Sequence, residues 1–396
     1  MNPCDVDPCD AMLRIPADFL REARRLFGRL RLADGARFPV EVCGAFDGIR
    51  LALGDGRCWL ESFRHAIGRA GGHGRVLLPW PVMADACRAD PGTLVELAAC
   101  RQGAGTRLRL GLRQGGARFV RFHSAAGGPV MAAPALPDGA SLRLPARSME
   151  ALAAVAPFAD WQAAAGPWRS GVCFSPADGG CLIAGNARCL ARVPLELPVM
   201  AAAPGLALPF ERPFVLPLGA LRVLLHPDFL GYENQLTLPC PGEEPRVMFR
   251  AWSHLLVTPV LPPGLMENDA MPWVDAAISA SRHLALDAVR RAQLLGWLRA
   301  LRDPQAPVSL IWRAEDGRLS VVQGRRRGRG ARLVLPPRDL AAALEFGGTL
   351  VVGEDHAGRM TLYCRTSGGA FCRIASLAGA AEGGRVGRAG GRRPAA

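Results

Sequence analysis

The sequence predicts an α+β protein built from three tandem repeats of one module, in which two helices pack on antiparallel sheets. Three observations predict this class. A strand that ends in Leu-Pro and leads into an amphipathic helix occurs three times at domain-sized intervals. A strand–Asp-Gly–strand unit precedes each of these junctions, and an amphipathic helix precedes each of those units. Self-similarity at a fixed period is typical of repeat architectures.

The Leu-Pro junctions end the expected strands 75–79, 213–217 and 332–336. Proline is tolerated in the first helical turn because its missing N–H would have no partner inside the helix. Each junction therefore predicts a helix that begins directly after Pro79, Pro217 or Pro336.

Helices are also expected over 17–30, 148–158 and 284–301, where apolar residues recur at helical spacing. Hairpins are expected at Asp55-Gly56, Asp178-Gly179 and Asp316-Gly317, because glycine supplies the positive φ of a tight turn. Alternating apolar residues predict two closing hairpins, which join 108–112 to 117–122 across Gly115-Gly116 and 360–364 to 370–374 across Gly368-Gly369.

Gly, Pro and Ala are enriched over 124–141 and 259–272, which predicts domain boundaries there. We expect an N-terminal extension (1–10), three domains (11–130, 131–264 and 265–378) and a disordered basic tail (379–396), since the tail lacks apolar periodicity.

The composition is that of a globular protein, with 396 residues, 49% hydrophobic residues and 21% charged residues. The sequence contains no apolar run of the roughly 18–20 residues that a membrane span needs. Residues 1–10 carry Asp5, Asp7 and Asp10 where a signal peptide would have positive charge. We therefore expect a cytoplasmic protein that does not bind membranes.

The formal net charge is +13, and arginine supplies all of the basic residues because the chain has no lysine. The absence of lysine excludes a Walker A phosphate loop and Schiff-base chemistry. The excess positive charge favours a polyanionic partner, nucleic acid first. The alternative is a basic protein from an arginine-rich proteome whose charge has no specific role.

Little in the sequence indicates a cofactor, a metal or catalysis. The twelve cysteines are scattered, mostly in apolar runs, and Cys4 and Cys9 form the only close pair outside such runs, without further ligands. The one tight acid–histidine cluster, Glu354-Asp355-His356, is expected in a hairpin turn, where a histidine is usually solvated. We expect no cofactor, no metal and no enzymatic activity, and an enzyme on a repeat scaffold is the alternative.

The stretch 171–194 carries a more specific signal. Gly171-Val172-Cys173-Phe174 is followed by an Asp-Gly turn and by the segment 184–191, AGNARCLA. This stretch resembles the G-V-x-F strand and the A-T-D-G-H-R-L-A segment of the bacterial sliding clamp, the β subunit of the replicative DNA polymerase. The segments 37–40 and 371–377 resemble the entry to the first hairpin and the C-terminal segment of that family. With the repeat order, the resemblance covers roughly residues 11–378.

The resemblance implies a non-catalytic DNA clamp. In that family two chains form a homodimeric ring around duplex DNA, and short peptides of DNA polymerase, clamp-loader and repair proteins bind to it. The alternative is a clamp-fold interaction or regulatory module that does not encircle DNA.

The resemblance implies that arginines on inward-facing helices contact phosphates without reading bases. The run Arg325-Arg326-Arg327-Gly328-Arg329 is a further candidate or, equally, a charged edge that protects against aggregation. The DNA-binding candidates are Arg21, Arg24, Arg25, Arg37, Arg147, Arg222, Arg290, Arg291, Arg299 and Arg302.

The resemblance also implies a pocket for partner peptides between the second and third domains, in which an extended peptide would bind. Its motifs are reduced in this chain, since 186–188 reads Asn-Ala-Arg in place of D-G-H. The matching positions are Gly185, Ala187, Arg188, Cys189, Leu190, Leu261, Pro262, Ile374 and Ser376.

Overall fold

The structure of the protein is a computed structural model. It describes residues 11–30, 38–45, 47–65, 70–102, 105–124, 133–159, 161, 171–176, 179–186, 188–195, 212–240, 242–261, 282–284, 286–312, 319–324, 331–354 and 360–377. The expected N-terminal extension and basic tail lie outside these residues. The chain divides into two compact units, one of Met1–Glu150, Glu196–Glu211 and Leu216–Leu261 and one of Ala151–Leu195, Arg212–Val215 and Pro262–Ala396.

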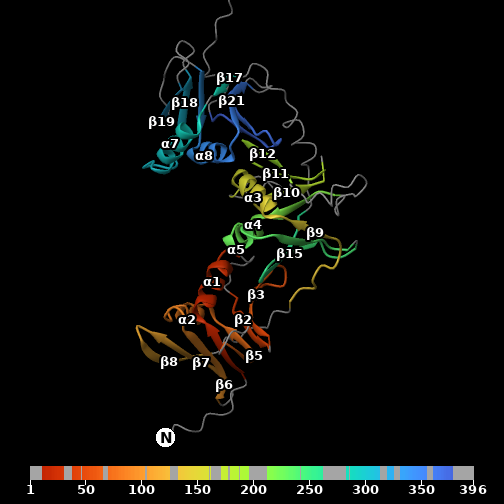
Figure 1. Cartoon of the computed structure of the whole chain (residues 1–396), viewed down its shortest axis with the longest axis vertical. Coiled ribbons are helices and arrows are strands. Elements are labelled where there is room, and N and C mark those ends of the chain that lie inside the picture. Colours follow the sequence, from red (N-terminus) through yellow and green to blue (C-terminus); the bar gives the residue numbers. More distant parts are fainter. Residues whose placement is uncertain are drawn as a thin grey trace, which may run out of the picture. The chain divides into compact units, whose positions relative to one another are not determined.

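The first unit is organised around a 12-stranded antiparallel sheet (Figure 1). Many residues of its strands are fully buried, among them Leu13, Leu51, Phe249 and Leu256. The strand order is β8 (Ala117–Ser124), β7 (Gly105–Gln114), β6 (Leu94–Gln102), β1 (Ala11–Pro16), β5 (Gly71–Leu78), β2 (Val40–Ala45), β3 (Gly48–Gly54), β4 (Trp59–His65), β16 (His254–Pro259), β15 (Arg246–Ala251), β14 (Asn234–Thr237) and β9 (Ser141–Leu144).

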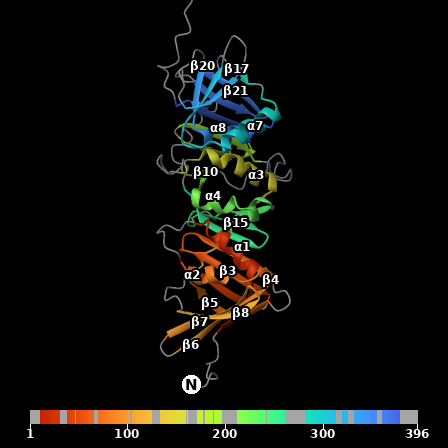
Figure 2. The same cartoon turned by 90° about the vertical axis from the view of Figure 1, so that its left-hand side faces the viewer.

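Helices α1 (Ala17–Phe27), α2 (Trp80–Ala86), α4 (Leu218–Leu224) and α5 (Pro227–Leu230) belong to this unit and lie on one side of its sheet (Figures 1 and 2). Their apolar faces are buried; in α1, for example, Phe19, Leu20, Ala23, Leu26 and Phe27 are at most 3% exposed. This burial leaves the polar faces of the helices, where the arginines are, toward solvent.

The second unit contains an 8-stranded and a 3-stranded antiparallel sheet. The larger sheet has the order β13 (Phe214–Pro217), β10 (Gly171–Ser175), β11 (Cys181–Gly185), β12 (Cys189–Pro194), β23 (Phe371–Ala375), β22 (Met360–Arg365), β21 (Thr349–Glu354) and β17 (Arg282–Leu284). The smaller sheet has the order β19 (Leu319–Gln323), β18 (Val308–Trp312) and β20 (Ala331–Leu335). Its helices include α7 (Ala288–Arg299) and α8 (Pro337–Phe346), and α3 (Ala146–Val155) with η1 (Ala156–Phe158) runs from the first unit into the second.

The structure confirms the α+β class and the three Leu-Pro junctions, since α2, α4 and α8 each begin directly after the predicted proline. The hairpins at Asp55-Gly56 and Gly115-Gly116 and the β22–β23 hairpin are confirmed. β10 pairs with β11 and β18 with β19 as expected, although Asp178, Asp316 and Gly317 lie outside the described residues. The number of repeats stays a prediction.

The predicted helix over 284–301 is wrong at its start. Leu284 ends β17, which pairs with β21, and the helix begins only after Asp287. The Asp287 side chain accepts a hydrogen bond from the backbone N–H of Arg290 at 2.7 Å, and this N-cap fixes the start. The predicted helix over 17–30 ends earlier, at Phe27. Among the described residues, no helix has the length and apolar character to cross a membrane.

Candidate nucleic-acid and peptide interfaces

Arg21 on α1 is held by contacts within the protein. One of its guanidinium nitrogens lies 2.5 Å from the Asp18 carboxylate, and the other donates to the carbonyls of Ala89 at 2.7 Å and Cys87 at 3.3 Å. The same Asp18 carboxylate accepts the backbone N–H of Gly92 at 3.0 Å, and these hydrogen bonds lower the pKa of Asp18. The arginine therefore joins α1 to the segment after α2, and its charge is partly neutralised there.

Arg24 and Arg25 are exposed in the last turn of α1. Arg29, which the sequence analysis did not single out, donates to the carbonyls of Arg222 at 3.4 Å and Leu225 at 3.5 Å, and so reaches α4. The residues just after α1 therefore lie beside the end of α4, which carries the predicted candidate Arg222. Cations in the last turn of a helix also face the negative end of its dipole.

The arginines of α7 are mostly engaged in ion pairs and hydrogen bonds. Arg290 lies 3.7 Å from its own N-cap residue Asp287, and Arg299 lies 2.8 Å from Glu345 on α8. Arg291 donates to the Gly348 carbonyl at 2.5 Å. Arg302, just after the helix, is exposed. The pairs formed by Arg290 and Arg299 are exposed, so water screens them and they contribute little stability.

The predicted cations not yet placed are Arg37, Arg147 and those of the run 325–329. Arg147 is exposed at the start of α3. Arg37 and the run 325–329 lie outside the described residues.

Six of the predicted peptide-contacting residues lie close together in the second unit, among them Gly185, which pairs with Leu190. β12 pairs with β23, which places Cys189 opposite Ile374, and the Ala375 N–H donates to the Arg188 carbonyl at 2.9 Å. Leu190 follows on β12, opposite Arg373. Beyond Ile374, the hydroxyl of Ser376 accepts the backbone N–H of Val334 at 3.0 Å.

The loop before β12 is fixed by Asn186. The side-chain oxygen of Asn186 accepts hydrogen bonds from the backbone N–H groups of Arg188 and Cys189, both at 2.9 Å. The backbone N–H of Asn186 donates to the Cys189 carbonyl at 2.8 Å. Asparagine favours such local turns. Asn186 therefore anchors this loop in a sequence that departs from D-G-H.

The apolar members of this group face the core. Cys189, Leu190 and Ile374 are 2%, 4% and 0% exposed, and Gly185 is buried. Arg188 is exposed, and Ser376 is partly exposed. Leu261 belongs to the other compact unit, while Ala187 and Pro262 lie outside the described residues.

Asp339, in the first turn of α8, belongs to this cluster and was missed by the sequence analysis. Its carboxylate lies 3.8 Å from the Arg188 guanidinium, and burial raises its pKa. Burial and then the Asp339 carboxylate raise the pKa of the Cys189 thiol well above its usual range, so the thiol is protonated at neutral pH and is a poor nucleophile. Apart from being an acidic side chain early in a helix, Asp339 carries no signal in the sequence.

A Ser–His–Asp arrangement in the first unit was also missed. Ser62 Oγ lies 3.0 Å from Nδ1 of His254, and Asp228 Oδ2 lies 3.6 Å from Nε2 of His254 and 3.1 Å from Nδ1 of His226. Ser62 is 0% exposed, in the middle of the sheet. A nucleophile must reach its substrate, and this hydroxyl does not. The group therefore links β4 to β16 and α5.

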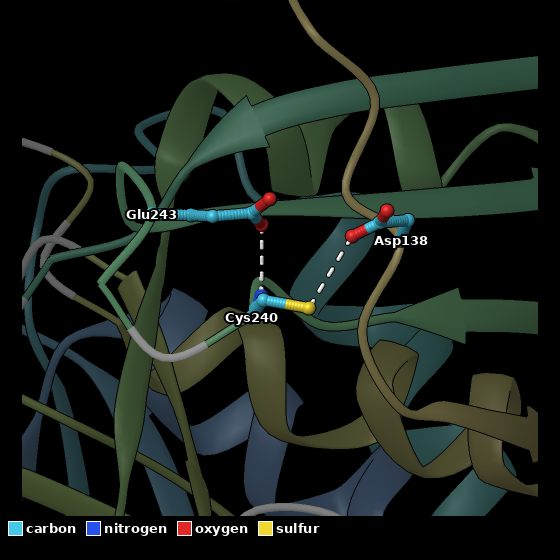
Figure 3. Close-up of side chains that lie close together, drawn as sticks. All are labelled: Asp138, Cys240 and Glu243. Atoms are coloured by element: carbon cyan, nitrogen blue, oxygen red, sulfur yellow. Dashed lines mark hydrogen bonds between the residues drawn. The ribbon is translucent and has the colours of Figure 1, made fainter.

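Among the described residues, one group has the donor atoms for a metal ion: Asp138, Cys240 and Glu243, whose ligand atoms lie within 4.8 Å of one another (Figure 3). The Cys240 thiol donates to Asp138 at 3.3 Å, and the Cys240 backbone N–H donates to Glu243 at 2.8 Å. The hydrogen bond to Asp138 raises the pKa of this thiol, and the donor atoms of the group are already engaged with one another. These contacts close the turn after β14, and we assign the group no metal. Of the acid–histidine cluster, Glu354 ends β21, and Asp355 and His356 lie outside the described residues.

No known family profile and no curated protein matches the chain. Solved structures do. The β chain of DNA polymerase III from Streptococcus pneumoniae is 14% identical, with a TM-score of 0.66 over 93% of this chain and 100% of that one. The DNA polymerase sliding clamp from Bacillus subtilis is 15% identical, with a TM-score of 0.65 over the same shares. The Helicobacter pylori β clamp, solved with a DNA ligase peptide, is 11% identical, with a TM-score of 0.61 over 93% and 100%.

The protein therefore has a clamp-like fold over nearly its whole length. In particular, the fold is that of the bacterial sliding clamp, the β subunit of DNA polymerase III. At these identities the similarity establishes the fold.

Proposed function

We propose that the protein is a divergent sliding clamp, a non-catalytic cytoplasmic homodimer of three-domain chains that encircles duplex DNA and tethers polymerase or repair proteins. The observation that carries this proposal is the extent of the match, since 93% of this chain and all of the S. pneumoniae chain superimpose. Fold alone does not imply function, so the proposal also depends on the positive charge of the chain and on the open edges of its sheets.

The charge supports a phosphate-binding role. The net charge is +13, and Arg24 and Arg25 are exposed in the last turn of α1, just before Arg29, which reaches α4. Contacts of this kind are independent of base sequence and weaken steeply with salt. Arg24, Arg25, Arg147 and Arg302 are the strongest candidates because they are exposed on or directly after helices.

Two open sheet edges support self-association. β8 ends the 12-stranded sheet and exposes Phe119 (41%), Val120 (43%) and Phe122 (63%), and β19 ends the 3-stranded sheet. An exposed apolar edge strand is a template for pairing with another chain. We propose that β8 of one protomer pairs with the β19 edge of the other, which would close the ring.

Partner peptides would bind beside the β12–β23 pair. The exposed Arg188 and the partly exposed Ser376 would contact the peptide, and Asp339 would hold Arg188 in place. Cys189, Leu190 and Ile374 would form the floor of the site, because their side chains are buried. The H. pylori β clamp was solved with a DNA ligase peptide bound, which supports this class of ligand.

The second candidate, a clamp-fold interaction module that does not encircle DNA, is favoured by one observation. Arg21, Arg290 and Arg299 are paired with acids, and Arg291 with a backbone carbonyl, so several candidate cations are partly neutralised.

Sedimentation velocity and retention on DNA separate the two candidates. A sliding clamp is a dimer in solution and, after loading, stays on nicked circular duplex at a salt concentration that releases it from linear duplex with free ends. A monomer with equal retention on both DNA forms would contradict the proposal and favour the interaction module.

A further inference from the structure

Trp252 lies in the two-residue turn that joins β15 to β16, directly after the pair formed by Ala251 and His254. Its side chain is 88% exposed. Its φ is 42°, which makes it the one non-glycine residue with positive φ in the described part of the chain.

This position is unfavourable for folding in two ways. A left-handed conformation is strained for a tryptophan, whereas glycine or asparagine would adopt it more readily. A large aromatic ring in water also forgoes the stabilisation that burial gives. Backbone strain of this kind is often found at functional sites. Among the described residues, the Trp252 side chain has no hydrogen bond or ring contact that would offset this strain, which points to a ligand.

Cations and a polar amide continue the surface beside Trp252. Along β15, Val247, Phe249 and Ala251 are fully buried, so Arg250 points to the opposite face, where its own side chain is exposed and that of Met248 is buried. Arg250 pairs with Gln235 on β14, and Gln235 pairs with Arg143 on β9, so these three exposed residues form one row across three strands. Neighbouring strands are about 4.8 Å apart, which places Arg143 and Arg250 about 10 Å from each other at the backbone.

We propose that this surface, defined by Trp252, Arg250, Gln235 and Arg143, is a binding site for single-stranded nucleic acid. A base stacks on the Trp252 indole, and the two guanidinium groups bind successive phosphates along the row. An aromatic ring beside a cationic row is how proteins bind single strands without sequence preference. One acid, Glu233, lies 4.0 Å from Arg143 with both side chains largely exposed, a weak pair that a phosphate replaces. Glu61 lies two strands beyond Arg250 in the same register.

The chemistry favours a nucleic acid over a peptide because the charged side chains of the row are all cationic. The site goes beyond the proposed clamp function, and it does not depend on ring closure. It lies on the sheet face opposite the buried side of β15 and uses none of the helix arginines, so the two functions fail independently.

Fluorescence anisotropy with a labelled oligothymidylate of about 20 nucleotides tests the site at low salt. Trp252→Asn removes the ring and suits the left-handed turn, so the variant folds at least as stably as the wild type, as thermal unfolding will show. We expect it to weaken binding roughly 5- to 150-fold, the effect of one stacked base. Trp252→Phe retains most of the affinity. Arg250→Gln reduces the slope of log K against log salt by about 0.7.

Tyr232→Ala is the matched control. This tyrosine is 50% exposed just before β14 and outside the row, and its loss should leave the affinity unchanged. Unchanged oligothymidylate binding by Trp252→Asn, or an equal loss in Tyr232→Ala, would overturn the proposal. Loss of a partner peptide's binding in Trp252→Asn, with oligothymidylate binding intact, would assign the surface to protein partners and overturn it too. Retention on nicked circular duplex reports on the clamp function separately.

Discussion

Ser62 and His254 lie opposite each other where β4 pairs with β16, and the Ser62 hydroxyl is 3.0 Å from Nδ1 of His254. With Nε2 directed at Asp228, 3.6 Å away, Nδ1 is the acceptor for this hydroxyl. The contact joins strands 192 residues apart in the sequence. It fixes the register in the middle of the 12-stranded sheet, where a slip of one residue would turn every side chain to the wrong face.

This contact predicts a loss of stability in acid. Burial lowers the pKa of both His254 and His226, against the raising effect of Asp228, while Arg25 and Arg29 lower the pKa of His226 further. The unfolded chain therefore binds protons at a higher pH than the folded chain does. The contribution of the two histidines to the free energy of unfolding is fully present above about pH 6.5, the pKa of histidine in the unfolded chain. This contribution is lost as the pH falls through the lower pKa values of the folded chain, by at most about 1.4 kcal/mol per pH unit per histidine.

Urea unfolding from pH 7.5 to 5.5 measures this effect. A His226→Gln/His254→Gln variant is less stable at pH 7.5, and its deficit relative to the wild type shrinks as the pH falls. His65→Gln, at an exposed histidine on β4, is the control and should follow the wild type. A deficit that stays constant with pH would show that the two buried histidines are not the groups that titrate.

The open β8 edge predicts how the dimer is disrupted. Phe122→Glu places a charge on a side chain that is 63% exposed in the isolated chain, so the fold tolerates it, but it would bury that charge in a dimer. We expect the dimer dissociation constant to rise at least about 30-fold, as for an interface hot spot. Sedimentation velocity across a dilution series measures it. Tyr232→Glu, at an exposed aromatic residue away from this edge, should stay dimeric; equal dissociation of both variants would exclude β8 as the interface.

The arginines of α1 predict the salt dependence of DNA binding. Arg24→Glu/Arg25→Glu changes two exposed side chains and leaves the Arg21 contacts to Asp18 and Ala89 intact. We expect the slope of log K against log salt for duplex DNA to fall by about 0.9 for each phosphate contact that is lost. Arg57→Glu reverses one exposed charge in the β3–β4 turn and is the control. If Arg57→Glu reduced this salt slope as much, DNA binding would depend only on the net charge of the protein and not on the position of Arg24 and Arg25.

The local elements could be predicted because their signals are local. Proline in the first turn fixes where α2, α4 and α8 begin, and glycine with positive φ fixes hairpins such as Gly115-Gly116. The start of α7 was missed although Asp287 carries an N-cap signal, because the apolar pattern extends back through Leu284. That leucine is instead paired in a strand with Leu350.

The site could be predicted only in part, because it depends on long-range pairing. The resemblance selected Cys189 and Ile374, and the β12–β23 pairing does bring them together. Their burial arises because two residues that are 185 positions apart in the sequence meet in one sheet, and no local sequence pattern indicates such a pairing. For the same reason Asp339, His254 and Trp252 were missed: the first two have their partners far along the chain, and the third is exposed in a turn whose backbone conformation the sequence does not indicate.

A last prediction concerns β5, one strand that pairs with two. Its first residues pair with β1 and its later ones with β2, and the change of partner occurs at the run Gly71–Gly74. Gly72 has φ +139°, and a Cβ there would lie 2.1 Å from the Met12 carbonyl oxygen. Gly72→Ala should therefore cost at least about 3 kcal/mol of unfolding free energy, since backbone on both sides must shift. Gly92→Ala is the matched control: its φ is +72°, but a Cβ would meet nothing within 4 Å, so only about 1 kcal/mol of conformational strain is expected. Urea unfolding of the two variants distinguishes steric clash from φ strain, and equal losses would show that β5 does not approach β1 as closely as described.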